Sequence, residues 1–337
     1  MIMRTILGVY LYKNNSKYFF FLPRYSSNVC STQHSQQLTE TYSGHNVLQK
    51  VDSDLSTVAP YLSNTFNLAA YVNNSQILQN FINLNVNLSK IEKKPFIAEK
   101  LLKLNFDAIK NHILFIKDHA GIDNIGSFIT VNPMIFFEPL EDLKVRINYL
   151  QSKRFHDDQI NRIITKNPFW IMFSTKRIDR RLGHFQDKFK LTGSELRMLA
   201  SKQPKLITYN LHHVKTNSFV IKEEMGFEDN EIKCLLLDKP KLWMIDQKSL
   251  LHRFNYIHNT IKIPHTQILN NPGILLCRNF RIKQRHLFLE KLGRAQYDPK
   301  KENYVPIIAL AENTDIEFCK AFAKCSVSDF NTFLKTL

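Results

Sequence analysis

The feature that most constrains the fold is a short proline-centred segment that returns through the C-terminal two thirds of the chain. Its copies are 129-ITVNPMIFF-137, 164-ITKNPFWIM-172, 200-ASKQPKLIT-208, 236-LLDKPKLWM-244 and 268-ILNNPGILL-276. Their prolines are Pro133, Pro168, Pro204, Pro240 and Pro272. They recur at a nearly constant interval, and a period of roughly 35 residues is typical of arrays of helical repeats. The sequence therefore predicts an all-α solenoid.

Apolar residues on both sides of each proline fall at helical spacing. The first stripe, eight and four positions before the proline, is Ile125 and Ile129, Ile160 and Ile164, Leu196 and Ala200, Ile232 and Leu236, and, with one exception, Pro264 and Ile268. The second stripe occupies the tenth, fourteenth and seventeenth positions after it, and only Ser218 and His286 interrupt it. Such spacing places side chains on one face of an α-helix, so each unit should contain two helices. One unit cannot bury both stripes alone, and neighbouring units must therefore stack.

The proline itself marks the end of the first helix in each unit. It lacks an N–H group and disfavours helical backbone angles at the preceding residue. Two apolar residues follow each proline closely: Ile135 and Phe136, Trp170 and Ile171, Leu206 and Ile207, Leu242 and Trp243, Ile274 and Leu275. This run is too short for another α-helix and predicts a 3-10 corner packed on the core.

Both ends of the array are expected to be atypical, because terminal repeats must close the core. Pro95 precedes Pro133 by close to one period and indicates a diverged first repeat. Weakly helical segments in residues 51–87 are expected to cap it, and after Pro272 the period decays into a C-terminal cap. The expected repeat domain is residues 88–337.

The N-terminal segment has the composition of a mitochondrial transit peptide. Residues 1–39 contain no Asp or Glu but four basic residues among aromatic, Ser and Asn residues. Such a composition favours import, with a transit peptide over residues 1–25. Residues 26–50 are polar and predict a flexible linker. No apolar run approaches the roughly 18 residues that a membrane-spanning helix needs.

The charge favours a polyanionic partner. The formal net charge is +16, and removal of residues 1–25 leaves +12. Between Lys144 and Lys222 there are 17 basic and 5 acidic residues, and between Leu276 and Lys301 there are 8 and 2. A basic excess of this kind attracts nucleic acid or an anionic surface.

The sequence carries no motif for catalysis or metal binding. Its five cysteines, Cys30, Cys234, Cys277, Cys319 and Cys325, form no C-x-x-C and have no His at metal-finger spacing, which favours reduced structural thiols. It has no glycine-rich loop, and no nucleophile, base or carboxylate pair stands at a catalytic spacing. We therefore expect neither enzyme activity nor a cofactor.

A helix that ends in L-x-x-x-P-x-L-L, repeated, resembles the motif of the mitochondrial transcription termination factor (mTERF) family. The resemblance spans about residues 88–337 and includes RHLFLEKLGRAQYDP and the closing FLKTL. It implies a left-handed superhelix with a basic concave groove, located in the mitochondrial matrix. It also implies binding of mitochondrial double-stranded DNA or ribosomal RNA, regulation of mitochondrial transcription and a role in large-ribosomal-subunit assembly.

Candidate ligand contacts are basic residues that do not recur in every repeat, because partner-specific residues need not follow the period. They are Lys176, Arg177, Arg180, Lys188, Lys190, Lys205, Lys215, Arg278, Arg281 and Lys283. The alternative is a solvated flank of the solenoid. Trp170 and Trp243 can stack on bases, but their place in the apolar corner favours a core role.

A second group recurs at the thirteenth position after each proline: Arg146, Arg181, Asn217, Arg253 and Arg285. This column is either a phosphate ladder or a set of side chains that bond carbonyls left open where the proline ends a neighbouring helix. A basic residue stands there in every unit but one, where Asn217 interrupts the ladder, and a packing device would show the same repetition, which favours the structural role.

Two functions remain open. One is a nucleic-acid binder that grips backbone phosphates. The other is a protein-binding α-solenoid adaptor for the mitochondrial transcription or ribosome-assembly machinery. The local excess of +12 over the middle repeats favours the nucleic-acid binder. We expect the protein to be a monomer.

Overall fold

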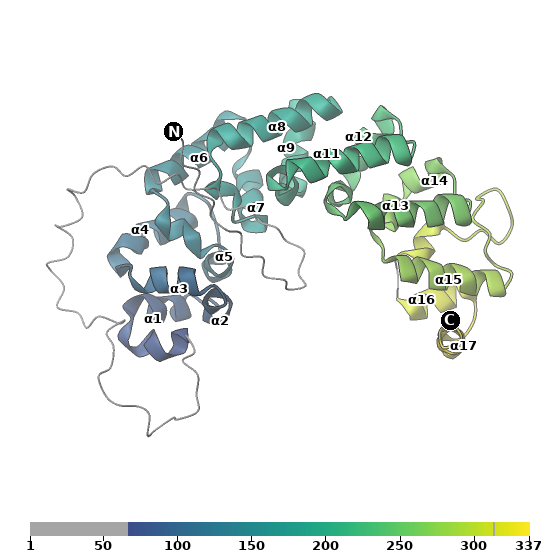
Figure 1. Cartoon of the computed structure of the whole chain (residues 1–337), viewed down its shortest axis with the longest axis horizontal. Coiled ribbons are helices and arrows are strands. Elements are labelled where there is room, and N and C mark those ends of the chain that lie inside the picture. Colours follow the sequence, from purple (N-terminus) through teal and green to yellow (C-terminus); the bar gives the residue numbers. More distant parts are fainter. Residues whose placement is uncertain (1–66, 313) are drawn as a thin grey trace, which may run out of the picture. The chain divides into compact units, whose positions relative to one another are not determined.

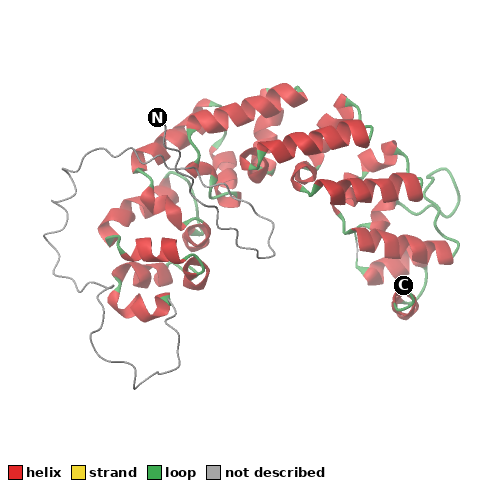
Figure 2. Ribbon diagram, in the orientation of Figure 1, coloured by secondary structure: helices red, strands yellow, loops and turns green. Residues whose placement is uncertain are grey.

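The computed structural model describes residues 67–312 and 314–337. The predicted transit peptide, the predicted linker and much of the N-terminal capping segment lie outside these residues. Within the described ranges every regular element is a helix and there is no strand (Figure 2). The all-α prediction is confirmed.

Each repeat consists of a first helix, a corner that starts near the proline, and a second helix (Figure 1). The first helices are α5 (Ile125–Val131), α7 (Asp157–Lys166), α9 (Gly193–Lys202), α12 (Asp229–Asp238) and α14 (His265–Asn270). The corners are η2 (Pro133–Phe137), η3 (Trp170–Met172), α10 (Pro204–Thr208), η5 (Pro240–Met244) and η7 (Pro272–Leu276). The second helices are α6 (Leu140–Ser152), α8 (Thr175–Phe189), α11 (Leu211–Phe219), α13 (Gln247–Asn255) and α15 (Asn279–Lys291). Helices α11 and α13 continue as single π-helical turns, η4 (Val220–Glu224) and η6 (Tyr256–Thr260).

The prolines end the first helices as predicted. All five helices stop two residues before their proline, and the residue between has φ from −125° to −140°. Their ψ angles, from 59° to 78°, are not helical either, as expected for residues that precede a proline. The expected 3-10 geometry is wrong for α10, which is one α-helical turn. The first residue of a 3-10 turn or of an α-helical turn donates no hydrogen bond within that turn. A proline, which lacks the N–H, can therefore begin either kind of turn.

Successive repeats pack through all three of their parts. First helices pack on first helices, as α7 does on α9 and α9 on α12, and corners pack on corners. Each second helix also rests on the corner of the next repeat, so that α11 contacts η5 and α13 contacts η7. Burial of the two stripes therefore depends on the neighbouring unit.

The core explains both polar interruptions of the second stripe. Buried Trp243 donates its indole Nε1–H to the Ser218 hydroxyl at 2.9 Å. His286 shares a hydrogen bond with the Tyr297 hydroxyl at 2.9 Å. Trp170 is buried as well. Both tryptophans are core residues and offer no ring face to a base.

The N-terminal end keeps the order of a repeat. Its elements are η1 (Leu68–Asn74), α1 (Gln76–Asn83), α2 (Leu88–Glu92), α3 (Pro95–Leu102) and α4 (Phe106–Asp118). Pro95 opens α3 between two further helices, which fits a diverged repeat.

The expected decay of the period after Pro272 is wrong in one respect. The C-terminal elements are η8 (Ile307–Leu310), α16 (Asp315–Phe318), the π-helical turn η9 (Cys319–Ala323) and α17 (Val327–Leu334). Pro306 follows Pro272 by close to one period and directly precedes η8, so a sixth corner is present. Irregular chain stands where its first helix would be, and the apolar stripe that reveals a repeat is therefore missing.

Candidate nucleic-acid interface

The residue at the thirteenth position after each proline reaches from its second helix to the corner of the next repeat. Arg146 donates from Nη1 to the Ile171 carbonyl at 2.6 Å, and Arg181 donates to the carbonyls of Ile207 and Tyr209. These carbonyls lie at the end of a corner, where a short turn leaves acceptors without a helical donor. The column therefore links each repeat to the following one.

Asn217 makes the same link without a charge. Its Nδ2 donates to the carbonyls of Leu242 at 3.3 Å and Ile245 at 2.8 Å. The imidazole Nε2 of His213, one turn earlier, also contacts the Ile245 carbonyl at 2.8 Å. Because a neutral amide makes these contacts, the link from this position to the next corner does not require a charge.

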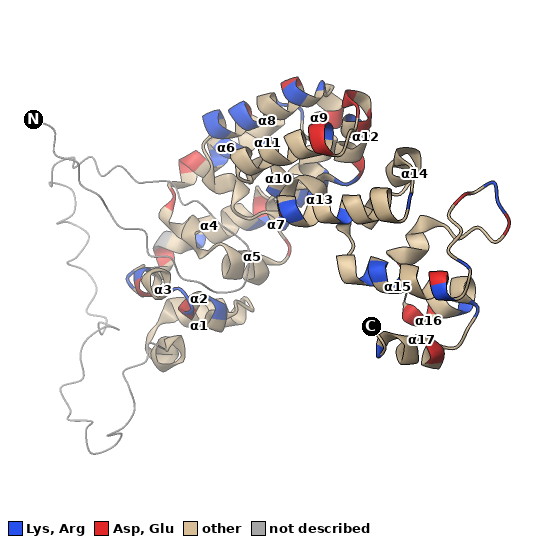
Figure 3. Ribbon diagram, turned by 45° about the vertical axis from the view of Figure 1, so that its right-hand side comes forward, with Lys and Arg blue, Asp and Glu red and all other residues tan. Residues whose placement is uncertain are grey.

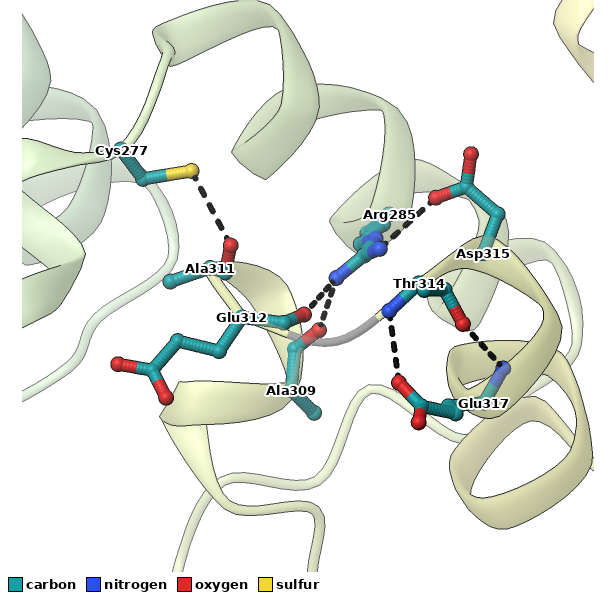
Figure 4. A network of polar contacts seen from close by, with 8 residues as sticks. All are labelled: Cys277, Arg285, Ala309, Ala311, Glu312, Thr314, Asp315 and Glu317. Carbon is teal, nitrogen blue, oxygen red and sulfur yellow. Dashed lines mark hydrogen bonds and ion pairs between the residues drawn. The ribbon is translucent and has the colours of Figure 1, made fainter.

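The last two members of the column are inside the protein. Arg253 is 8% exposed and donates to the Leu275 carbonyl, and burial lowers its pKa. Arg285 is 0% exposed and donates to the carbonyl oxygens of Ala309, at 2.8 Å, and Glu312 (Figure 4). Neither guanidinium group is accessible to a phosphate.

The network around Arg285 closes the C-terminal end of the repeat array. Its Nη2 forms an ion pair with the Asp315 carboxylate at 2.8 Å (Figure 4). The guanidinium carbon lies 4.7 Å from the ring centroid of Phe318. The sixth corner is thus held in the same way as the others, with a cation–π contact added; an ion pair also occurs at Arg146, which pairs with Glu138 at 2.8 Å.

Three of the predicted residues lie along α8, and Figure 3 shows bands of Lys and Arg on this helix. Lys176 and Arg180 are exposed, whereas Arg177 is half-buried with its guanidinium carbon 4.4 Å from the centroid of Phe173. In the described chain no carboxylate pairs with these three cations; the nearby Asp179 pairs with Lys153 at 2.8 Å instead. The face can therefore accept an external anion.

Three more predicted residues meet at one cavity of about 550 Å³, which we call the lysine pocket. Lys188 and Lys190 come from the end of α8, and Lys215 comes from α11. Two further lysines in the pocket, Lys222 and Lys233, are already engaged with Asp229 at 2.6 Å and Glu195 at 2.9 Å.

Cations outnumber carboxylates in the lysine pocket, where five lysines stand against Glu223 and Asp229. Burial lowers the pKa of His184, which lines the pocket, and Lys215, Lys188 and Arg181 lower it further, while Asp187 opposes them. Within the described ranges no carboxylate lies within ion-pair distance of Lys188, Lys190 or Lys215. The arrangement has the charge of an anion site.

A larger cavity of about 760 Å³ runs across the corners of successive repeats, and we call it the corner groove. Its cations are Arg162, Lys166, Lys202, Lys205, Lys239 and Lys241, against the carboxylates of Asp238 and Glu312. Lys202 donates to the Leu237 carbonyl at 2.7 Å. Burial lowers the pKa of Lys166, and the like charges of Arg162 and Lys241 add to this effect. Cations from three repeats therefore share one groove.

Of the six groove cations, only Lys205 was predicted. Lys166 and Lys202 share the second position before a repeat proline, and Lys205 and Lys241 share the first position after one, whereas Lys239 stands alone at its position. The preference for charges that break the period left out Lys166, Lys202 and Lys241.

The last three predicted residues belong to α15 and its start. Arg278 and Arg281 line a cavity of about 380 Å³, and the Arg278 guanidinium carbon lies 6.0 Å from the centroid of Phe280. Lys283 is exposed outside this cavity. The ten predicted residues thus lie at four places and do not form one site.

Comparison with known proteins identifies the repeat. The model of the mTERF family matches residues 71–318. The chain belongs to the mTERF family. It is 47% identical over 274 residues to Transcription termination factor 3, mitochondrial, of Drosophila melanogaster, which covers 81% of this chain and 77% of that protein. The protein of the same name from Rattus norvegicus is 44% identical over 285 residues, covering 84% and 70%. Transcription termination factor 4, mitochondrial, of Mus musculus is 25% identical over 218 residues, covering 64% and 62%.

The mTERF match begins within η1 and ends with α16, so it includes all the corners from Pro95 to Pro306. In the part of the chain that the structure describes, no group of three His, Cys, Asp or Glu residues is placed to hold a metal ion, and the cysteines are free thiols. The same part contains no helix with the length and apolar character to cross a membrane.

Proposed function

We propose that this mTERF protein acts in the mitochondrial matrix as a nucleic-acid-binding regulator of mitochondrial transcription or large-ribosomal-subunit assembly, without catalysing a reaction. Its relatives are named mitochondrial transcription termination factors, which supports a mitochondrial location and a role in transcription. Its ligand is mitochondrial double-stranded DNA or ribosomal RNA, held by the backbone.

The corner groove carries this proposal. Arg162 and Lys166 of α7 and Lys241 of η5 come from two repeats, and the charges of Arg162 and Lys241 lower the pKa of Lys166. Within the described residues none of the three has a carboxylate at ion-pair distance. Uncompensated cations in a row attract a polyanion, whose condensed counterions are released on binding.

The residue types of the groove favour contact with phosphates over contact with base edges. Five of its six cations are lysines, whose flexible ammonium groups act as point charges without the planar fork of arginine. Phosphate contacts fix position and orientation but carry no sequence information directly. We therefore expect modest sequence preference.

The test is a triple replacement of groove cations, Lys166, Lys205 and Lys241→Ala. Log Kd should depend less steeply on log salt, by about 2.7 units on duplex DNA or about 2.1 on single strands, at roughly 0.9 or 0.7 per phosphate contact. Fluorescence anisotropy from roughly 50 to 200 mM salt measures both the affinity and this slope.

A matched control removes three cations from elsewhere, Lys110, Lys117 and Lys320→Ala, with the same change in net charge. These lysines are exposed and lie outside the groove. If both triple variants lose the same slope, only net charge matters and the groove is not the interface. If neither changes it, the adaptor function takes precedence, with ribosome-assembly or transcription proteins as partners.

A further inference from the structure

The lysine pocket contains one side chain that phosphate binding does not explain. Phe219, the last residue of α11, lines the pocket and is 60% exposed. Its neighbours Ser218 and Val220 are buried, so the core is complete without this phenyl ring. An aromatic ring held in water beside cations is costly unless something covers it.

Charge and aromatic ring alternate along α11 and the turn η4 that continues it. Lys215 of α11 stands one turn before Phe219, and Lys222 of η4 follows three positions after it. Residues three and four apart are neighbours on a helix surface. Lys188 and Lys190 face this row from the end of α8 across the cavity. The result is a ring face flanked by ammonium groups on two helices.

This combination matches the chemistry of a nucleotide, which has a flat aromatic base and phosphates on both sides. We infer that the lysine pocket holds one unstacked nucleotide of a single strand, with its base on Phe219 and its flanking phosphates on Lys188 and Lys215. The volume of about 550 Å³ falls within the roughly 300–1,000 Å³ of small-ligand pockets.

The geometry of stacking indicates whether the pocket binds single-stranded or duplex nucleic acid. In a duplex both faces of each base are covered by neighbouring pairs, whereas bases of loops and single strands offer a free face to aromatic side chains. Phe219 therefore favours single-stranded or looped nucleic acid, while the corner groove grips backbone of either kind. This inference rests on the proposed function and adds a preference to it.

The two sites can be tested separately because they lie at opposite ends of α12. Asp229 at the start of this helix lines the lysine pocket, and Asp238 at its end lines the corner groove. Nine steps of helix separate them by about 13 Å, at about 1.5 Å per residue. A substitution at Phe219 therefore leaves the groove cations in place.

The experiment measures the affinity of the full mature chain for three probes at one salt concentration. The probes are an oligouridylate of about twelve nucleotides, an abasic sugar–phosphate oligomer of equal length, and a duplex of equal length. Phe219→Ala should weaken binding of the oligouridylate by roughly 5- to 150-fold, the loss of one base–aromatic stack. Binding of the abasic oligomer and of the duplex should not change.

Phe219→Trp provides a spectroscopic readout. Both natural tryptophans are buried, so an exposed indole at this position gives a separate emission signal. The oligouridylate should quench it, the abasic oligomer should not, and affinity should be retained. Phe96→Ala is the control, since Phe96 is also exposed but lies outside the pocket.

Three results would each overturn the inference. The first is an unchanged affinity of Phe219→Ala for oligouridylate, and the second is an equal loss of affinity for the abasic oligomer. The third is an indole at position 219 whose emission oligouridylate does not quench. If the wild-type chain binds duplex with a steep salt dependence while these results hold, only the inference fails. If the wild-type chain binds none of the probes, the proposed function fails with it.

Discussion

Replacement of Arg285 by Ala tests whether the recurrent arginine column is structural. The guanidinium group is fully buried, and three acceptors depend on it: the carbonyls of Ala309 and Glu312 and the carboxylate of Asp315. Removal of one partner of a buried ion pair costs about 3–5 kcal/mol, because the groups left behind lose their donors. The side chain of Asp315 is 47% exposed and gains water in exchange, so we expect about 3 kcal/mol.

The assay is thermal or denaturant unfolding followed by circular dichroism. A loss of about 3 kcal/mol should lower the melting temperature by roughly 4–5 °C, because the unfolding entropy is about 2.1 cal/mol/K per residue. Because repeats contact only their neighbours, the loss should appear first as early unfolding of the C-terminal elements from η8 onward. Nucleic-acid affinity, measured well below the transition, should change little.

Arg281→Ala is the matched control. It lies one turn earlier on the same helix, carries the same charge and is partly exposed. Its loss should change the free energy of unfolding by less than about 0.5 kcal/mol. The structural interpretation is refuted if Arg285→Ala unfolds like the control while binding nucleic acid about ten-fold more weakly, since that is the behaviour of a phosphate contact.

Two further predictions concern α8 and pH. Replacement of Lys176, Arg177 and Arg180 by Ala should weaken nucleic-acid binding and make the salt slope shallower by about 0.9 per lost duplex contact, with an unchanged melting temperature; an unchanged slope would make this face a solvated flank. Burial lowers the pKa of His265 and His286 below the ordinary value of about 6.5, so folding favours their neutral forms. The stability they contribute is complete above about pH 6.5 and is lost as pH falls through the lowered folded values, so the melting temperature should drop between about pH 7.5 and 5. A variant with Gln at both positions should show a smaller drop, and an equal drop would assign the effect to other groups.

The fold was predictable because many local signals agree. A proline, two helical stripes and an apolar corner recur together, and each alone is weak. Where one signal is absent, the prediction fails: the corner after Pro306 has no first helix before it, so the stripe is missing and only the proline interval remains. Its partner, Arg285, was visible in the sequence, but its acceptors were not, because they lie 24 and 27 residues away on a corner without a pattern.

The candidate sites were less predictable, because packing on the neighbouring repeat determines which side chains line the same cavity. Lys188 and Lys215 lie on different second helices, and nothing in their spacing shows that they line one cavity. Sequence reasoning favoured charges that break the period, whereas the corner groove contains pairs that share a position in the repeat, Lys166 with Lys202 and Lys205 with Lys241, of which only Lys205 was predicted. Regularity suits the shape of the ligand, since a nucleic-acid backbone presents phosphates at regular intervals.

The column and the groove are connected through the corners they share. Arg181 bonds the carbonyls at the end of α10, which carries Lys205, and Asn217 bonds those at the end of η5, which carries Lys241. A buried donor fixed to each corner holds the exposed cation of that corner in register with its neighbours. Loss of a column residue therefore lowers stability first and disturbs the groove as a consequence. On the proposed function, loss of a groove lysine should remove a ligand contact and leave the repeat intact.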